Sequence, residues 1–337
     1  MPHAVQQATA PTPAKPNLAD KLPPGTRERL EGAGIKLSAY PTWPEKPSDI
    51  KLAASVRAGS RPHSDPGARA DKSKKALFSA ATKVINLSEH IGTEVVGLQL
   101  SQLTDQQKDE LALLIAERTV VFFRDQDLTP EQQRDLGAYF GEVEVHPSAA
   151  QVPGLPGVSI IWDELAPEKK SFGFRNPFGT QDWHTDSPTG RRATPLMTTS
   201  RPRSVALNQR HSCTLQVRVH PATGWKSLFV NRKYTLRIVG FEPAESKLLL
   251  DYLFDVYEKS LDSQIRFHWT PRTSALWDNR ISIHAAVYDH EGKVPRHGTR
   301  VSSLAEVPYF DANAPSRREA LGLDKPEDFL PRKEVEY

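Results

Sequence analysis

Alternation of apolar and polar residues begins near residue 84 and predicts a folded region from there onward. Residues 94–100 alternate in the way that is typical of a half-buried strand. Thr104 and Gln107 have the spacing of a capping box, and the helix that they begin is predicted to end at about residue 118. Its inward face is formed by apolar residues at helical spacing, namely Leu111, Leu114 and Ile115.

Two further helices and a series of short strands follow. Thr129 as N-cap, Pro130 at the first position and Gln132 begin a helix that ends at Gly141. The next helix is predicted from Pro243 to about Lys259, with its core side formed by Leu249, Leu253 and Val256. Strands are expected at 120–123, 143–146, 157–163, 226–231, 264–270, 273–277, 281–288 and 299–304. Many short strands with a few helices outside them predict a mainly β (α+β) sandwich or jelly roll.

The first 75 residues differ in composition from the rest of the chain. They hold 11 of the 28 prolines and carry 13 Lys or Arg against 7 Asp or Glu, a net charge of +6, whereas the remainder carries −3. Stretches without hydrophobic periodicity cannot offset the entropy of ordering. We predict that residues 1–78 form a largely disordered, basic extension and that 79–337 form the folded domain. A basic tail that docks on an acidic partner is the alternative.

Composition also narrows the class of protein. Among the 337 residues no apolar run is long enough for a membrane span, and residues 1–16 lack the apolar core of a secretory signal, so a cytoplasmic protein without a membrane partner is expected. The single Cys213 excludes an internal disulfide and a thiolate metal cluster. Between Asp186 and Glu242 stand ten Lys or Arg and no acidic residue, but no aromatic residue precedes Trp225, so a nucleic-acid partner is not expected.

Two histidines and one aspartate form a candidate metal site. His184 and Asp186 are two positions apart, so in a strand their side chains leave the same face. His284 stands at the head of a later predicted strand. Two imidazoles and one carboxylate on one face of an octahedral ion are the ligand set of non-haem Fe(II) oxygenases. A surface pair is the alternative for an H-x-D pattern alone, but Arg296 and Arg300, which suit anions, favour the metal site.

At this point the chain resembles a known family, the Fe(II)/2-oxoglutarate-dependent taurine (alkylsulfonate) dioxygenases. The matching segments cover most of 84–305 in the family's order, and they include VFFRDQ at 121–126, FGE at 140–142, WHTD at 183–186, HPATG at 220–224 and WDNR at 277–280. The resemblance implies a double-stranded β-helix, or jelly roll, in agreement with the strand count.

The resemblance also implies roles for single residues. His184, Asp186 and His284 match the iron ligands, and Arg296 matches the arginine that holds the distal carboxylate of 2-oxoglutarate. Arg300 and His146 match residues that bind the substrate's sulfonate; for His146, capping of its own loop before a proline is the alternative. The implied reaction uses Fe(II), 2-oxoglutarate and O2 to hydroxylate a small anionic molecule, an alkylsulfonate such as taurine, giving an aldehyde, sulfite, succinate and CO2.

The chain departs from the family pattern in two respects. Ala149 and Thr180 stand where taurine-specific members carry residues that help to hold the amino-sulfonate, so an oxygenase acting on a sulfate ester or an aryloxy acid is an alternative. Asp186 and His220 are only 34 positions apart, which leaves no room for the family's 2-oxoglutarate-binding G-G-D-T motif. We interpret 187–217 as a truncated or wrongly spliced replacement that leaves the jelly roll without some core strands. An inactive member of the family is therefore a second alternative, and a homo-oligomer is left open.

Overall fold

A computed structural model describes the chain over most of its length. The described residues are 62–146, 149–162, 183–186, 197–200, 212–215, 217–232, 235–287 and 297–323, with short helical pieces at 27–28, 31–32 and 56. None of the described helices is both long enough and apolar enough to cross a membrane.

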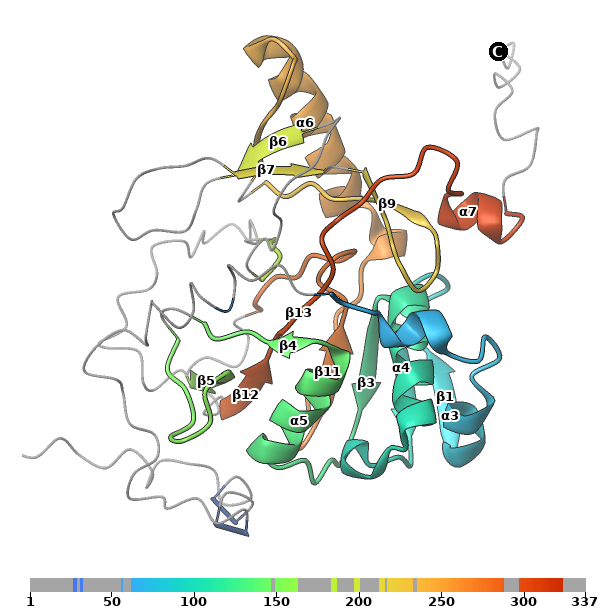
Figure 1. Cartoon of the computed structure of the whole chain (residues 1–337), viewed down its shortest axis with the longest axis vertical. Coiled ribbons are helices and arrows are strands. Elements are labelled where there is room, and N and C mark those ends of the chain that lie inside the picture. The colour runs from blue at the N-terminus through green and yellow to red at the C-terminus, as the bar shows by residue number, and fades with distance from the viewer. Residues whose placement is uncertain are drawn as a thin grey trace, which may run out of the picture.

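A four-stranded sheet combines three strands from the early part of the chain with one from the late part. Its strands, in spatial order, are β1 (Lys83–Asn86), β2 (Thr93–Val96), β3 (Val120–Phe123) and β11 (Ser274–Trp277). The β2–β3 pair is parallel and the other two pairs are antiparallel. Three helices accompany this sheet in Figure 1, namely α3 (Lys75–Ala80), α4 (Asp105–Arg118) and α5 (Pro130–Phe140).

Local capping chemistry defines the starts of α4 and α5, as the sequence predicts. The Thr104 hydroxyl accepts a hydrogen bond from the Gln107 backbone N–H while the Gln107 side chain accepts one from the Thr104 N–H. Thr129 and Gln132 repeat this reciprocal pair at α5. Each box satisfies backbone donors that a helix N-terminus leaves without partners, so both predicted starts are confirmed.

The strand β3 is covered on both faces. Val121 and Phe123 are fully buried in a cluster that includes Leu111 and Leu114 of α4. Phe122 points to the other face, where its ring stacks on Phe267 with 3.8 Å between the ring centroids. A strand with two buried faces reads as a continuous apolar run, which accounts for the VVFF sequence at 120–123.

A second layer is formed by α6 (Pro243–Lys259) and a three-stranded sheet. The sheet order is β10 (Thr235–Ile238), β6 (Met197–Ser200) and β7 (Ser212–Leu215), and Figure 1 shows β6 and β7 beside α6. The sequence did not predict β6 or β7, which lie within the atypical stretch 187–217.

The predicted core side of α6 is wrong by about one residue. Leu250 and Phe254 are buried against Val230 and Ile238, whereas the predicted Leu249 and Val256 are exposed; Leu253 packs at the edge of this cluster. Apolar residues occur nearly all around this helix, so their spacing alone does not select one face. Ser246 lies on the buried side, where its hydroxyl accepts a hydrogen bond from the backbone N–H of Ile238.

Three two-stranded pairs complete the described sheet structure, and two of them bring late segments against early ones. They join β5 (Val158–Trp162) to β12 (His297–Val301), β4 (Glu142–Val143) to β13 (Ser303–Leu304), and β8 (Val217–Val219) to β9 (Lys226–Leu228). The strand predicted at 264–270 is absent, since these residues have no regular structure after the 3-10 turn η6 (Leu261–Ser263). Of the strand predicted at 281–288, the described residues form only a single bridge at His284.

Packed structure begins within the range predicted as an extension. The 3-10 turn η3 (Pro66–Arg69) lies against α4, and Asp65, Pro66 and Gly67 are buried. The Asp65 carboxylate accepts a hydrogen bond from the Gly67 N–H at 2.8 Å and so caps this turn. The short helix α3, which contacts α4, begins within the same range and ends two residues beyond it, at Ala80.

The core side of α6 gives a stability prediction. Replacing Leu250, which is 4% exposed, with Ala should lower the free energy of unfolding by about 2–5 kcal/mol, because the substitution leaves a cavity. Replacing Leu248, which is 74% exposed, should change it by less than about 0.5 kcal/mol. Urea unfolding followed by circular dichroism would measure both, and equal effects would contradict this orientation of the helix.

Candidate metal centre

His184 and His284 lie directly opposite each other in an isolated antiparallel bridge. The N–H of His184 donates to the carbonyl of His284 at 2.9 Å, and the N–H of His284 donates to the carbonyl of His184 at 2.8 Å. This exchange of backbone hydrogen bonds brings the two imidazole rings to a centroid separation of 4.5 Å. The Trp277 ring at the end of β11 lies edge-on to His284, 5.5 Å away.

Asp186 completes the cluster, as its position two residues after His184 predicts. One ligand atom from each of His184, Asp186 and His284 lies within 4.8 Å of the others, and all three residues are half-buried. The Asp186 Oδ2 atom is 3.7 Å from Nε2 of His284. The structure therefore brings together the three residues that the sequence predicts as metal ligands.

Arg300 of β12 reaches the same carboxylate from the far side. Its Nη1 donates to Asp186 Oδ1 at 2.6 Å. The register of β12 on β5 places Arg300 opposite Ser159, so the pairing of these two strands holds the backbone of Arg300 in place. The two carboxylate oxygens consequently have different surroundings: Oδ1 faces a cation and Oδ2 faces an imidazole.

The donor set fits a divalent metal such as Fe(II). Asp186 Oδ2 is buried and accepts no hydrogen bond from any residue that the structure describes, which is costly for a carboxylate oxygen without a cation. Two imidazoles and one carboxylate are the ligands that non-haem Fe(II) sites use. A ligating carboxylate commonly has its second oxygen hydrogen-bonded, and Arg300 provides that bond.

Of the remaining residues that the sequence predicts near the site, the structure describes His146 but not Arg296 or Thr180, which lie outside the described residues. His146 follows β4 in a loop, where its Nδ1 accepts a hydrogen bond from the N–H of Ala149 at 2.9 Å. This contact is the loop-capping role that the sequence left open for His146, and its contact with a substrate stays a prediction.

A buried ionic network supports the segment that leads to His284, and sequence reasoning did not assign it. Arg280 donates to Asp278, and its Nη1 also lies 2.8 Å from Asp65 and 2.7 Å from Glu306. His220 Nε2 is 2.8 Å from Asp278 Oδ2, with both side chains buried. The HPATG and WDNR motifs contain His220, Asp278 and Arg280. The resemblance to the family therefore pointed to these residues but did not indicate what they do.

Contacts between opposite charges in this network determine the protonation of Asp278. Burial alone would raise the pKa of the Asp278 carboxyl, but the charge of Arg280 and the hydrogen bond with His220 hold it far below its usual range. His63, Asp65 and Glu306 also lie close enough together to hold an ion. The guanidinium of Arg280 already supplies the positive charge between the two carboxylates, so this second cluster is a structural ion pair.

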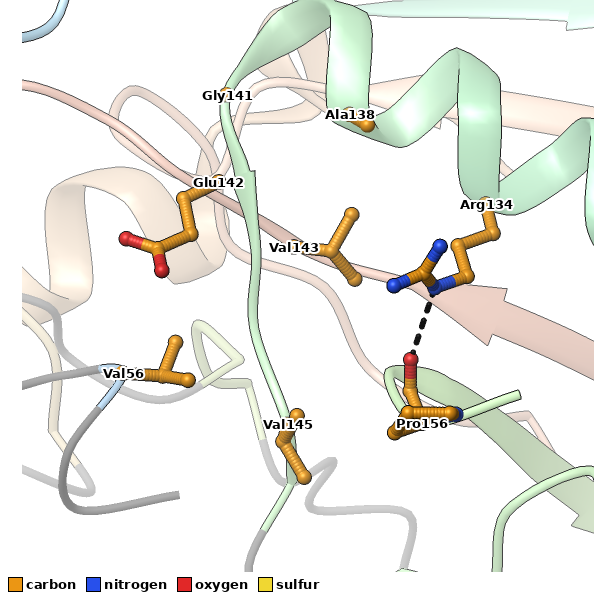
Figure 2. A pocket seen from close by; sticks show the side chains of 8 residues that line it. All are labelled: Val56, Arg134, Ala138, Gly141, Glu142, Val143, Val145 and Pro156. Carbon is orange, nitrogen blue, oxygen red and sulfur yellow. Dashed lines mark hydrogen bonds between the residues drawn. The ribbon is translucent and has the colours of Figure 1, made fainter. Parts of the chain in front are cut away.

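A separate cavity of about 460 Å³ opens between α5 and β4 (Figure 2). Its lining includes Arg134, which donates to the carbonyl of Pro156 at 3.1 Å, and Val56 from the N-terminal region. None of the predicted site residues that the structure describes lines this cavity.

The fold and the three-residue cluster define a protein of the non-haem metal oxygenase class, and comparisons with known proteins agree. The family model described as taurine catabolism dioxygenase TauD, TfdA family, matches residues 83–206 and 198–302. The chain belongs to this TauD/TfdA family. The two matched parts meet within the stretch 187–217 that the sequence marked as atypical. The fold of the family is the jelly roll, and its members are dioxygenases that depend on iron and 2-oxoglutarate.

Individual relatives are similar over most of their length. An alpha-ketoglutarate-dependent sulfonate dioxygenase from Saccharomyces cerevisiae is 30% identical over 73% of this chain and 74% of its own. The alpha-ketoglutarate-dependent dioxygenase cnsP from Penicillium expansum is 32% identical over 85% of this chain and 92% of its own. The crystal structure of a taurine dioxygenase from Burkholderia xenovorans superposes with a TM-score of 0.53 at 27% identity and covers 67% of this chain and 90% of its own.

The ionic network gives a prediction about pH and stability. The folded-state pKa of Asp278 lies below the unfolded value of about 4, so its stabilising effect is complete above that pH and is lost as the pH falls through the acidic range. Asp278→Asn should cost about 3 kcal/mol at pH 7, because it leaves Arg280 and His220 without their shared partner.

Urea unfolding between pH 7 and pH 3 measures both effects. The unsubstituted protein should lose stability more steeply below pH 5 than Asp278→Asn does. Asp262→Asn, at an exposed position of η6, is the control and should follow the unsubstituted protein. Parallel curves for all three proteins would contradict the role assigned to Asp278.

Proposed function

We propose that this chain is a cytoplasmic Fe(II)- and 2-oxoglutarate-dependent dioxygenase that hydroxylates a small anionic molecule, with an alkylsulfonate such as taurine as the first candidate. The products would be an aldehyde, sulfite, succinate and CO2. The observation that carries this proposal is the position of Arg300, whose guanidinium is held beside the candidate metal ligand Asp186.

Each residue of the cluster has a defined part in this proposal. His184, Asp186 and His284 would hold the metal, which, when bound, supplies the oxygen chemistry of the reaction. Arg300 uses Nη1 for Asp186 Oδ1, and its planar fork has further N–H donors that suit the oxygens of a sulfonate or carboxylate. The anionic end of the substrate would thereby be fixed next to the metal without binding to it.

Supporting evidence for the sulfonate comes from relatives and from charge. The similar yeast protein is a sulfonate dioxygenase, and the similar Burkholderia protein is a taurine dioxygenase. A divalent metal with one carboxylate ligand and a neighbouring arginine leaves the site with net positive charge, which favours anions. Arg296, as the binding residue for the far carboxylate of 2-oxoglutarate, and His146, at the sulfonate end, complete the proposal.

Removal of the carboxylate ligand tests the metal assignment. Asp186→Ala should abolish substrate-dependent succinate formation and should weaken Fe(II) binding, because it removes the one anionic ligand of the cluster. Asp262→Ala, which removes an exposed carboxylate from η6, is the matched control and should retain both. Succinate formation by Asp186→Ala at the control rate would overturn the assignment.

Two substitutions of Arg300 test the substrate assignment. Arg300→Ala should raise the KM for the substrate roughly 30- to 150-fold, which corresponds to the loss of a charge-assisted contact of about 2–3 kcal/mol. Arg300→Lys keeps the positive charge but loses the planar arrangement of N–H donors. Its KM for the substrate should therefore lie between that of the unsubstituted protein and that of Arg300→Ala. The assay is succinate formation with a panel of a sulfonate, a sulfate ester and an aryloxyacetate.

The panel also separates the alternatives. Turnover of only the sulfate ester or only the aryloxyacetate would move the proposal to that substrate and away from sulfonates. A folded protein that binds Fe(II) but shows no charge-transfer band after anaerobic addition of 2-oxoglutarate would be an inactive member of the family. Such a result would overturn the proposed activity.

A further inference from the structure

We propose that Asn279 is a positioning residue for the metal centre: its carboxamide takes the place of a missing strand partner and fixes the backbone of Asp186. This inference rests on the assignment of His184, Asp186 and His284 as metal ligands. It adds a residue that neither the sequence analysis nor the family match assigns a role.

The argument starts from the pattern of an antiparallel bridge. His184 and His284 exchange both backbone hydrogen bonds, so they form a hydrogen-bonded pair. In such a ladder the next hydrogen-bonded pair lies two residues further along each strand, which would join Asp186 to residue 282. The ladder does not continue to that pair, because residues 278–281 form a turn and the Ser282 hydroxyl donates back to the carbonyl of Asp278.

Asn279 supplies the two hydrogen bonds that residue 282 would have made. Its Oδ1 accepts from the backbone N–H of Asp186 at 3.0 Å, and its Nδ2 donates to the backbone carbonyl of the same residue. One carboxamide therefore satisfies both peptide groups of Asp186, as a strand partner does. The direction of the Cα–Cβ bond of a residue follows from its backbone, so this pair of bonds aims the carboxylate toward the histidines.

The backbone at Asn279 is held in place because its two neighbours in the sequence belong to the buried ionic network. Asp278 and Arg280 precede and follow it, and the backbone N–H of Asp278 donates to the carbonyl of Thr119 at 3.0 Å. These contacts join the turn to the end of α4 and to the paired strands β3 and β11. Asn279 thus transmits the position of the four-stranded sheet to the metal ligand.

A second asparagine lies on the opposite side of the same segment. Thr185, between the two ligands, is 1% exposed, and its hydroxyl lies 3.5 Å from Nδ2 of Asn231, which is also 1% exposed. This contact is longer than the Asn279 bonds and touches a side chain only. We therefore assign the orientation of Asp186 to Asn279.

The Kd for Fe(II) distinguishes a positioning role of Asn279 from a merely structural one. The experiment titrates the metal-free 337-residue chain with Fe(II) alone, anaerobically, by calorimetry at a temperature at which all variants are folded. Asn279→Ala should raise the Kd for Fe(II) by about 10- to 100-fold, the usual effect of losing a partner that orients a ligand. Asn279→Gln, which keeps the carboxamide on a longer stem, should fall between this value and the original Kd.

The matched control removes a comparable contact elsewhere. Asn86 of β1 accepts a hydrogen bond from the Thr93 hydroxyl at 3.0 Å, and Asn86→Ala should leave the Kd unchanged. A purely structural role for Asn279 would lower the melting temperature of the metal-free protein while leaving the Kd of the folded protein unchanged. An unchanged Kd in either folded Asn279 variant would overturn the inference. If the unsubstituted chain failed to bind Fe(II), the metal-ligand assignment would fall first, and this inference with it.

Discussion

The exchange of two backbone hydrogen bonds between His184 and His284 is the contact on which the candidate site depends. It joins two segments that are one hundred residues apart, and neither belongs to a longer strand in the part of the chain that the structure describes. A single bridge has little stability of its own, because only two hydrogen bonds offset the entropy of bringing distant segments together. Its persistence requires support from outside the bridge, and the surrounding contacts provide that support.

That support comes mainly from charges buried beneath the site. Arg280 has carboxylates from three parts of the chain within ion-pair distance, Asp65, Asp278 and Glu306. Removing one partner of such a cluster costs much more than an exposed ion pair contributes, because the remaining charges are already out of water. The network therefore ties the first packed turn of the chain, the end of the four-stranded sheet and the last strand segments to one guanidinium. The metal ligands themselves do not join these three parts of the chain.

Features that depend on neighbouring residues could be predicted from the sequence. The capping boxes at Thr104 and Thr129 are local, since three residues determine each of them, and both are present. The H-x-D pattern likewise places two side chains on one side whenever the backbone is extended. His284 joined them first as a hypothesis from the ligand set that it completes, and then through the resemblance to a family, because no local pattern determines a contact across one hundred residues.

Features that depend on distant partners were missed or misassigned. Ile265, Phe267 and Trp269 alternate as in a strand, but Phe267 packs by its ring on Phe122 and the backbone has no strand partner. The inward side of α6 was misassigned because apolar residues surround the helix. The roles of Asn279 and Arg280 depend on contacts across 93 residues and on a carboxylate 26 residues away, which no local pattern indicates.

The contact between Asp186 and Arg300 has a consequence for the order of events during synthesis. The two residues are 114 positions apart, and His284 lies between them in the sequence. A ribosome adds roughly 5–20 residues each second, so several seconds pass between the appearance of the first ligand and that of the arginine. During this interval the nascent chain holds an aspartate and a histidine without the contacts that orient them. Arg300 can hold the Asp186 carboxylate only once β12 has emerged and paired with β5, so the oriented form of the metal site arises later in synthesis than its three ligands.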